Sequence, residues 1–393
     1  MACIGSGRLC ARVEKLCLLG QVTQIRRKTN YARLKQFTTQ PSARTFVQSC
    51  QYGSMRTQAP GPQPQVAMDP YLLLANDLKD IYTDIRRELE LNTSQPELSR
   101  IATYYFDGQG KALRPMVTVL MSRAVNCHQL PGKSLLLPSQ REVAMISEMI
   151  HTASLLHDDV IDQADFRRGK PSVNALWSQK KVAMAGDFIL AVASMMIARL
   201  HNDSVTKILS QVLQDLVQGE FMQLGSKETE NERFAHYLTK TYRKTASLIA
   251  NSVKATAVLA GADEPLSELC FQYGRNVGLA FQLVDDLLDF VSSTAAMGKP
   301  AAADLRLGLA TAPVLFACEK YPELNPMIMR RFQEPGDVEH AFELVHRSRG
   351  LEQTQFLARQ HVAEASRLAS SLAESPYQKA LQVVGDFVIN RMK

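Results

Sequence analysis

The sequence lacks the features that mark disulfide-rich, zinc-binding and membrane-spanning proteins. Of seven cysteines in 393 residues, four lie in the first 50, and the other three, Cys127, Cys270 and Cys318, are too widely spaced for a metal-binding pair. We therefore expect reduced thiols in a reducing compartment. No stretch reaches the ~18 apolar residues of a membrane-spanning helix. The best, from Phe188 to Leu200, is too short and follows Asp187, so we expect no membrane span.

Strict alternation of apolar and polar residues, the pattern of a half-buried strand, is also missing. Apolar residues recur at spacings of three and four instead, and Gly and Pro are modest at 20 and 17. This predicts an all-α fold with a single folded body.

Acidic residues are nearly absent from the first 68 positions, which hold ten Lys or Arg and only Glu14. The net charge of +6 therefore consists of +9 in this leader and −3 in the rest, so nothing calls for nucleic acid. A basic, acid-poor leader with short apolar bursts is typical of a mitochondrial transit peptide, although a disordered basic tail has a similar composition. A Pro/Gln-rich linker over 58–65 follows. We expect the leader and linker to span 1–66 and the catalytic body 67–393, with its first helix capped at Asp69-Pro70.

Two acidic clusters of the same form lie in otherwise apolar helical segments, predicted over about 139–163 and 265–293. In each cluster the first and last aspartates are four residues apart and share one helix face. Crowded carboxylates on an apolar helix repel each other unless a cation neutralises them. Facing clusters would hold several Mg²⁺ ions and a diphosphate, whereas solvated acidic helix faces are the simpler alternative. The candidate ligands are Asp158, Asp159 and Asp162 in the first cluster and Asp285, Asp286 and Asp289 in the second.

Small and polar residues precede the aspartates along both helices. Ser147, His151 and Ser154 lead to the first cluster, and Gly274 and Gly278 lead to the second. This pattern predicts helices that line an internal cavity with its polar mouth at the aspartates. Close helix packing explains the glycines equally well. The first helix is expected to begin with a capping box formed by Ser139 and Glu142.

Basic residues in loops could bind a second phosphorylated substrate. Lys111 and Arg114 lie three apart at a predicted helix start, and Arg167-Arg168 follows the first acidic cluster. Guanidinium groups and a helix N-terminus suit phosphate oxygens. Each element alone is weak evidence, because an Arg-Arg pair is commonly a solvated loop and His151 on an apolar helix is commonly a core residue. Mg²⁺ would make a diphosphate a good leaving group, and a dry pocket would protect the resulting carbocation.

In this order and spacing, the motifs resemble those of the trans-isoprenyl diphosphate synthases over essentially the whole body. The matching residues are Gly110-Lys111-x-x-Arg114-Pro115, His151-x-x-Ser154-Leu155-Leu156-x-Asp158-Asp159-x-x-Asp162 with Arg167-Arg168-Gly169, Lys244-Thr245, Phe281-Gln282-x-x-Asp285-Asp286-x-x-Asp289, and Gly298-Lys299. The stretches 218–227 and 231–237 are similar to the catalytic subunits of animal mitochondrial members that make the ubiquinone side chain. The resemblance implies a single-domain helical bundle around a central apolar cavity.

The resemblance also implies residue roles. The six aspartates would bind up to three Mg²⁺ and the allylic diphosphate (farnesyl or geranylgeranyl), assisted by Arg167, Lys244 and Lys299. Isopentenyl diphosphate would be bound by Lys111, Arg114, His151 and Arg168, and Thr245 and Gln282 would line the reaction centre. Short-chain members carry bulky aromatics at the positions of Ala153 and Ser154, so a long product is expected here. Gln163 replaces an acid common in relatives, and we expect tuning rather than loss of activity.

Three alternatives remain on the sequence alone: a terpene cyclase, a short-chain prenyl synthase, and a non-catalytic scaffold subunit. The second Asp-Asp-x-x-Asp cluster and the pair Lys111 and Arg114 argue against a cyclase, and the intact aspartates argue against a scaffold. The resemblance further implies a hetero-oligomer with a catalytically degenerate second subunit. It places the protein in the mitochondrial matrix or on the matrix side of the inner membrane, with peripheral membrane contact compatible with an insoluble product. The number of isoprene units and the preferred primer stay open.

Overall fold

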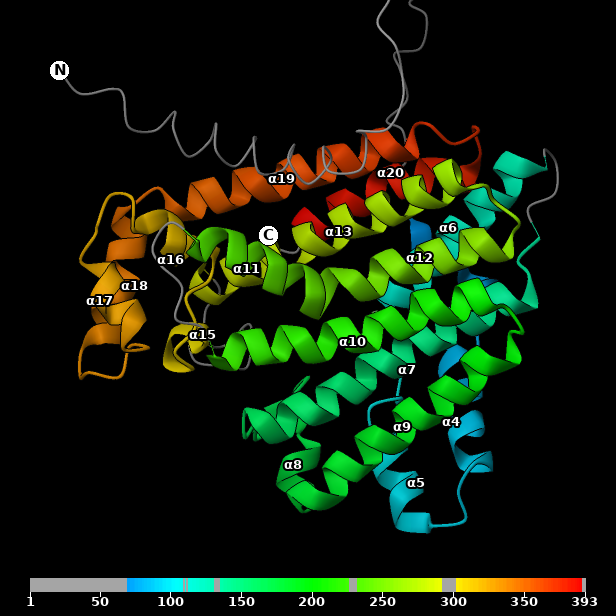
Figure 1. Ribbon diagram of the computed structural model, residues 1–393, viewed down its shortest axis with the longest axis horizontal. Helices are drawn as coiled ribbons and strands as arrows, with labels where there is room; N and C mark the ends of the chain where they lie inside the picture. Colours follow the sequence, from blue (N-terminus) through cyan, green and yellow to red (C-terminus); the bar gives the residue numbers. More distant parts are fainter. Residues whose placement is uncertain are drawn as a thin grey trace, which may run out of the picture. The chain divides into compact units, whose positions relative to one another are not determined.

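The structure is a computed structural model that describes residues 69–108, 110, 112–130, 135–225, 232–291 and 302–390 (Figure 1). These residues belong to one compact unit, Ala67–Lys393. The predicted transit peptide and linker lie outside the described residues, as do Lys111 and Lys299. The boundary of the compact unit falls beside the predicted first cap, where the Asp69 side chain accepts a hydrogen bond from the Tyr71 amide at 2.8 Å.

The described part of the chain is almost wholly helical, which confirms the predicted all-α class. Its α-helices are α2 (Pro70–Leu73), α3 (Ala75–Leu78), α4 (Ile81–Leu91), α5 (Pro96–Thr103), α6 (Leu113–Gln129), α7 (Pro138–Ile161), α8 (Val173–Leu176), α9 (Gln179–Arg199), α10 (Asp203–Gly225), α11 (Arg233–Thr241), α12 (Ser247–Leu259), α13 (Glu264–Val291), α15 (Ala303–Arg306), α16 (Ala312–Ala317), α17 (Leu324–Met329), α18 (Asp337–Arg347), α19 (Gly350–Ala369) and α20 (Pro376–Ile389). A single turn of π-helix, η1 (Tyr242–Ala246), joins α11 to α12. The described strands are β1 (Phe166–Arg167) and β2 (Lys170–Pro171), an antiparallel hairpin that the sequence pattern did not predict.

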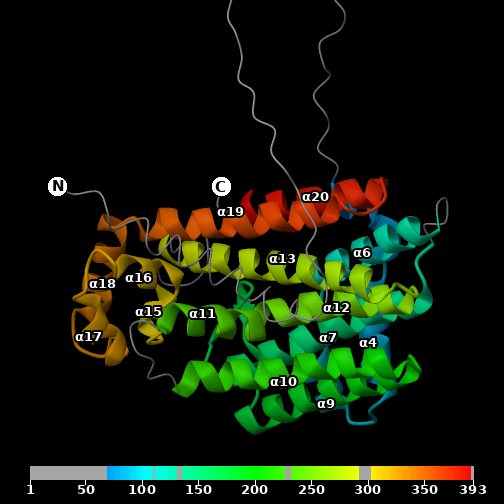
Figure 2. The same cartoon turned by 45° about the horizontal axis from the view of Figure 1, so that its top comes forward.

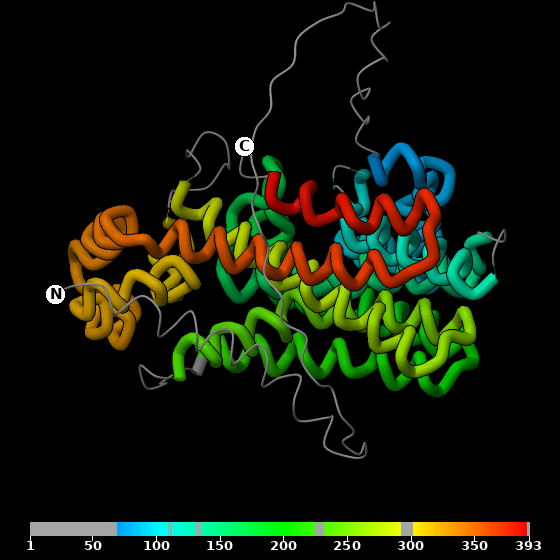
Figure 3. Tube along the Cα trace, turned by 90° about the horizontal axis from the view of Figure 1, so that it is seen from above, coloured from blue at the N-terminus to red at the C-terminus, as the bar shows by residue number. Residues whose placement is uncertain are grey.

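Long helices pack side by side around α12 and α13, and α13 carries the second acidic cluster. Figures 1 and 2 show α13 between α19 and α12, and α10 beyond α12. The first acidic helix, α7, contacts α6, α9 and α12. Both acidic helices therefore pack against α12, which follows directly after η1. A second, smaller core, formed by residues from Phe290 to Val345, lies among α15 to α18 at one end of the helices (Figure 3).

Glycines allow α13 to approach its neighbour closely. A Cβ atom on Gly278 would lie 2.5 Å from the Cα of Ala246, and one on Gly274 would lie 2.7 Å from the Cα of Ala250. Both distances are far below a van der Waals contact, so these positions require glycine. The glycine stripe therefore serves close helix packing, and the prediction that Gly274 and Gly278 line a cavity is wrong.

The first acidic helix begins one residue earlier than predicted and with a different cap. Pro138 occupies its first position, and the Gln140 side chain accepts a hydrogen bond from the Leu137 amide at 3.0 Å. The expected capping box of Ser139 and Glu142 is therefore wrong. Proline at the first helical position leaves no unsatisfied amide there, so the start shifts to it.

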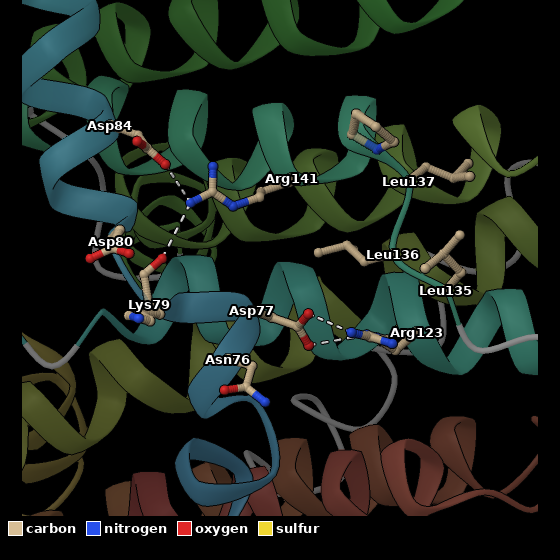
Figure 4. Close-up of a pocket in the computed structure, with 11 residues that line it drawn as sticks. Asn76, Asp77, Lys79, Asp80, Asp84, Arg123, Leu135, Leu136, Leu137 and Arg141 are labelled. Carbon is tan, nitrogen blue, oxygen red and sulfur yellow. Dashed lines mark hydrogen bonds and ion pairs between the residues drawn. The ribbon is translucent and has the colours of Figure 1, made fainter.

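The N-terminal segment that follows the predicted cap is broken into three short helices, α2, α3 and α4. Asp80 adopts a left-handed backbone conformation (φ 63°) between α3 and α4. Two ion pairs fix these pieces to α6 and α7: Asp77 with Arg123, and Asp84 with Arg141 at 2.6 Å (Figure 4). They line a pocket of about 480 Å³ that contains none of the predicted site residues.

Helix α9 is long and apolar enough to cross a membrane by length and composition alone, which differs from the expectation from the sequence. Its alanines and methionines give the helix a high mean hydropathy, although charged residues interrupt its apolar run. In the structure 44% of its most apolar window is buried, and α9 packs against α7 and α5. Buried core helices of soluble proteins can have the same length and hydropathy, so these two properties are weak evidence that α9 spans a membrane.

Candidate active site

The first acidic cluster lies at the C-terminal end of α7, and its middle member points into the protein. Asp159 is fully buried; it accepts a hydrogen bond from the Tyr105 hydroxyl at 2.5 Å and another from Nε of Arg167. Asp158 is half-buried and Asp162 is exposed. A buried carboxylate is stable only when it is paired and hydrogen-bonded, so two donors fix Asp159 in place.

The short hairpin after α7 positions Arg167. Its turn places Arg168 (φ 53°) and Gly169 (φ 75°) in the left-handed region, as a type I′ turn requires. Lys170 anchors the hairpin by donating to the carbonyl of Tyr104 at 2.9 Å and to the carboxylate of Asp107 at 2.6 Å. The two adjacent arginines consequently separate: Arg167 reaches the acidic cluster, while Arg168 reaches Gly110.

The second acidic cluster, near the end of α13, repeats this arrangement. Asp286 is 2% exposed and accepts hydrogen bonds from the Tyr237 hydroxyl at 2.5 Å and from Nε2 of Gln282 at 2.9 Å. The Thr245 hydroxyl donates to Oε1 of Gln282 at 2.8 Å. Burial raises the pKa of Asp286, which these donors counteract. Predicted reaction-centre residues Thr245 and Gln282 are thus brought together with the second cluster.

The last aspartate of the second cluster is also engaged. The two carboxylate oxygens of Asp289 accept hydrogen bonds from the amides of Ala303 at 3.0 Å and Asp304 at 3.1 Å. Asp289 therefore holds the start of α15 against α13. Asp285, the first aspartate of the cluster, is half-buried.

The pKa of Asp158 is raised, because the neighbouring positive charges only partly compensate for its burial. Burial raises its pKa to about 6; the charges of Glu220 and Asp162 add to this effect, and Lys244 opposes it. Within the described residues, no three Asp, Glu, His or Cys side chains lie close enough to form a metal site on their own. The donor set nevertheless suits a hard cation such as Mg²⁺, because it offers carboxylate oxygens in a partly desolvated place.

Lys244 comes from the π-helical segment η1. Its ammonium group pairs with the carboxylate of Glu220 and donates to Oε1 of Gln223 at 3.3 Å, both on α10. A Cβ atom on Gly219 would lie 2.8 Å from Cγ of Lys244, so the glycine makes room for this side chain. Single π-helical turns occur frequently at functional sites, because they change the direction of the side chains they contain.

Nearer the N-terminal end of α7, cationic side chains gather around a buried acid, Glu148. Nε of Arg114 is buried without a hydrogen-bond partner, and Arg114 interacts electrostatically with Glu148, Arg168 and Asp285. Burial, together with the neighbouring arginines, holds the pKa of His151 well below its usual range, so its imidazole is neutral. The predicted isopentenyl diphosphate residues in the described part of the chain therefore share one neighbourhood.

The two residues predicted to control product length differ in environment. Ala153 is fully buried in the main core. Ser154 is half-buried, and its hydroxyl donates to the carbonyl of His151 at 2.8 Å. Ser154 thus continues the stripe of His151 toward Asp158, whereas Ala153 packs against other helices.

Sequence reasoning missed several residues of the site. Tyr105 and Tyr237 fix the two middle aspartates, Glu220 pairs with Lys244, and Glu148 lies among the arginines. A signal was available for Glu148, which precedes His151 by three residues and shares its helix face. No local pattern marks the tyrosines, because each is about fifty residues from its aspartate.

Comparison with known proteins places this geometry in a family. The model of the family described as polyprenyl synthetase matches residues 95–345. The chain is 56% identical over 325 residues to "All trans-polyprenyl-diphosphate synthase PDSS1" of Homo sapiens, covering 83% of this chain and 78% of that protein. It is 43% identical over 345 residues to "Decaprenyl-diphosphate synthase subunit 1" of Schizosaccharomyces pombe, covering 82% and 91%.

A solved structure supports the same assignment. The polyprenyl synthase from Caulobacter crescentus CB15, crystallised with calcium and isoprenyl diphosphate, has a TM-score of 0.74 and 31% sequence identity, and the match covers 84% of this chain and all of that one. The resemblance predicted from the motifs, including that to subunit 1 of the animal all-trans-decaprenyl diphosphate synthase, is confirmed. This chain belongs to the polyprenyl synthetase family and is similar to its long-chain all-trans members.

Proposed function

We propose that this enzyme condenses isopentenyl diphosphate repeatedly onto an allylic diphosphate, farnesyl or geranylgeranyl, to make a long all-trans polyprenyl diphosphate for the ubiquinone side chain. The observation that carries the proposal is the paired arrangement of the acidic clusters. In each, the middle aspartate is buried and fixed by a tyrosine, and the first aspartate is left half-buried.

All six aspartates belong to the proposed magnesium site, but with different tasks. Asp158, Asp162 and Asp285, which are half-buried or exposed, are proposed to hold Mg²⁺ together with the other three aspartates, up to three ions per site. Asp159, Asp286 and Asp289 support them through the hydrogen bonds that fix the helices. Bound Mg²⁺ would neutralise the charge that develops on the leaving diphosphate. The described side chains do not form a complete metal site by themselves. Oxygens of a diphosphate bound between the clusters would supply the missing ligands.

The chain's own cations complete the allylic site. Lys244 already lies beside Glu220 and contributes to the electrostatic environment of Asp158. Nε of Arg167 donates to Asp159, and this bond fixes the guanidinium group. The other guanidinium nitrogens of Arg167 can then bind a phosphate oxygen. Lys299 is proposed for the same diphosphate on the resemblance alone.

Isopentenyl diphosphate is proposed to bind at the cationic cluster around Glu148, which precedes the first aspartates along α7. The guanidinium groups of Arg114 and Arg168 would form forked contacts with it, and Lys111 would add a point charge. His151, neutral because of its burial, would donate one N–H. The protein supplies no general base in this scheme; the released diphosphate takes the proton.

Product length is proposed to depend on Ser154 and Ala153. Neither side chain is bulky enough to block growth of the chain along α7. Because Ser154 lies on the same stripe as His151, a large residue there would obstruct the path most directly.

A hetero-oligomer is proposed from the resemblance to first subunits of two-subunit synthases. Val217, Phe221 and Leu224 support it: they recur on one face of α10 and are 60%, 72% and 54% exposed. Apolar side chains gathered on one helix face are typical of a protein interface. The basic, acid-poor leader supports a mitochondrial location, and peripheral membrane contact is proposed from product insolubility.

Chain elongation by the full chain tests the proposal. Labelled isopentenyl diphosphate, farnesyl diphosphate and Mg²⁺ should give a long product, either from the chain alone or after addition of the second subunit, and a chelator should abolish it. Asp285→Asn should remove activity, whereas Asp165→Asn, an exposed acid beyond the first cluster, should not. Absence of product in both assays, with correctly folded protein, would favour the non-catalytic scaffold instead.

A further inference from the structure

The hydroxyl of Tyr82 joins three segments on the cationic side of the site. It donates to Oε1 of Glu148 on α7 at 3.2 Å and accepts a hydrogen bond from the backbone of Ala112 at the start of α6. Tyr82 itself belongs to α4. One side chain therefore connects α4, α7 and the turn that leads into α6, the helix of Arg114.

That turn is tightly packed and has a strained backbone. A Cβ atom on Gly110 would lie 2.9 Å from the Tyr82 hydroxyl oxygen and 2.8 Å from Nη1 of Arg168. Ala112 adopts a left-handed conformation with φ 43° and ψ 36°. A non-glycine residue keeps such a conformation only when its surroundings impose it, and the bond to Tyr82 is part of what imposes it here.

Glu148 supplies the negative charge in this neighbourhood. It is 3% exposed, and burial raises its pKa, while the charges of Arg114 and Arg168 lower it. Burial and the charge of Glu148 raise the pKa of Tyr82 far above its ordinary value, so the phenol stays a neutral donor. Arg114 is in turn stabilised in its charged form by Glu148, against the cost of its own burial.

The arginines keep their donors available. Neither Arg114 nor Arg168 makes a hydrogen bond or short ion pair within the described residues, and Nε of Arg114 is buried without a partner. Glu148 therefore balances their charge from a distance without occupying their hydrogen-bonding groups. The hydrogen bond from Tyr82 keeps the Glu148 carboxylate from pairing directly with either arginine.

We propose that Tyr82 and Glu148 form a positioning pair that holds Gly110 and Ala112 before α6, and with them the two arginines, ready for the diphosphate of the condensing substrate. The inference rests on the proposed function, because it assigns that substrate to this cationic cluster. Neither residue touches the reacting atoms; both act through Arg114, Arg168 and the turn.

Steady-state kinetics on the full chain, with each substrate varied separately, tests the pair. Tyr82→Phe and Glu148→Gln should each raise KM for isopentenyl diphosphate by about tenfold or more, the scale of a lost hydrogen bond to a charged group. KM for the allylic substrate should change less than about twofold, since the acidic clusters keep their own anchors. Tyr377→Phe, a tyrosine on α20, is the matched control.

The double variant separates a pair from two independent residues. If Tyr82 acts by holding Glu148, the combined effect should be clearly smaller than the product of the single effects. Glu148→Asp, which keeps the charge, should retain more binding than Glu148→Gln. A change in KM of the double variant equal to the product of the two single changes would overturn the pairing.

The direction in which Glu148→Gln changes KM for isopentenyl diphosphate discriminates most clearly between the possible roles of Glu148. If Glu148 merely repelled the substrate, removing its charge would lower KM for isopentenyl diphosphate. A purely structural role would lower Tm and leave both KM values unchanged. Either result overturns the proposal. Calorimetric titration with isopentenyl diphosphate separates failure of the positioning pair from failure of the proposed function. Wild-type protein that binds this ligand but does not elongate contradicts the function alone. A Tyr82 or Glu148 variant that binds it as tightly as the wild type contradicts the pair.

Discussion

Asp158→Asn should stabilise the metal-free protein while removing its activity. Burial raises the pKa of Asp158 from 3.8 to about 6, so folding disfavours its ionised form. At 1.36 kcal/mol per pKa unit, the ionised carboxylate costs about 3 kcal/mol of folding free energy at neutral pH. Asparagine has a similar shape and no charge, so most of this cost disappears.

The pH dependence follows from the same difference. The folded protein binds the Asp158 proton more tightly than the unfolded chain does, so stability rises as pH falls through about 6 toward 3.8. Above pH 6 the cost is fully present. The variant should lack this contribution, and its advantage over the wild type should shrink as the pH is lowered through that window.

Thermal unfolding in the presence of a chelator measures the effect. With an unfolding entropy of ~2.1 cal/mol/K per residue, 3 kcal/mol corresponds to an increase in Tm of roughly 4 °C for a body of this size. Adding Mg²⁺ with inorganic diphosphate should reverse the order, because ligand binding stabilises the wild type and not the variant. An unchanged or lower Tm of metal-free Asp158→Asn at pH 8 would refute the reasoning.

Four further substitutions test other parts of the site. Tyr237→Phe removes one donor from a buried carboxylate and should cost ~1–3 kcal/mol in thermal unfolding, with reduced elongation; an unchanged Tm would contradict the anchoring role. Ser154→Phe should shorten the product seen by chromatography without loss of folding, whereas Ala153→Phe should also destabilise by ~1–3 kcal/mol because it overpacks the core; unchanged product length in both would end the gating idea. Gly278→Ala would place a Cβ 2.5 Å from the Cα of Ala246 and should lower both Tm and activity; full activity would show that η1 tolerates displacement.

The sequence predicted the helical class and the two acidic helices well, because both depend on local spacing. Helical periodicity decides which residues share a face, and the identical aspartate spacing indicated a paired site. It could not decide which aspartates turn inward. That depends on Tyr105 and Tyr237, whose hydroxyls reach Asp159 and Asp286 from distant segments.

The errors of prediction have the same origin. The glycine stripe of α13 was compatible with a cavity or with close packing, and only the distance between Gly278 and Ala246 decides for packing. The π-helical turn that carries Lys244 and Thr245 has no local sequence signal, because it depends on how α11 and α12 pack against α10 and α13. The hairpin that separates Arg167 from Arg168 was too short for a strand pattern to appear.

The central claim is that α7 and α13 contribute to one metal-dependent diphosphate site. Calorimetric titration of Mg²⁺ with inorganic diphosphate into the wild type, Asp158→Asn and Asp285→Asn tests it most directly. We expect the two ligands to bind the wild type far more tightly together than separately, and either substitution to abolish this cooperativity. Cooperative binding that survives in one of the two variants would contradict a shared site.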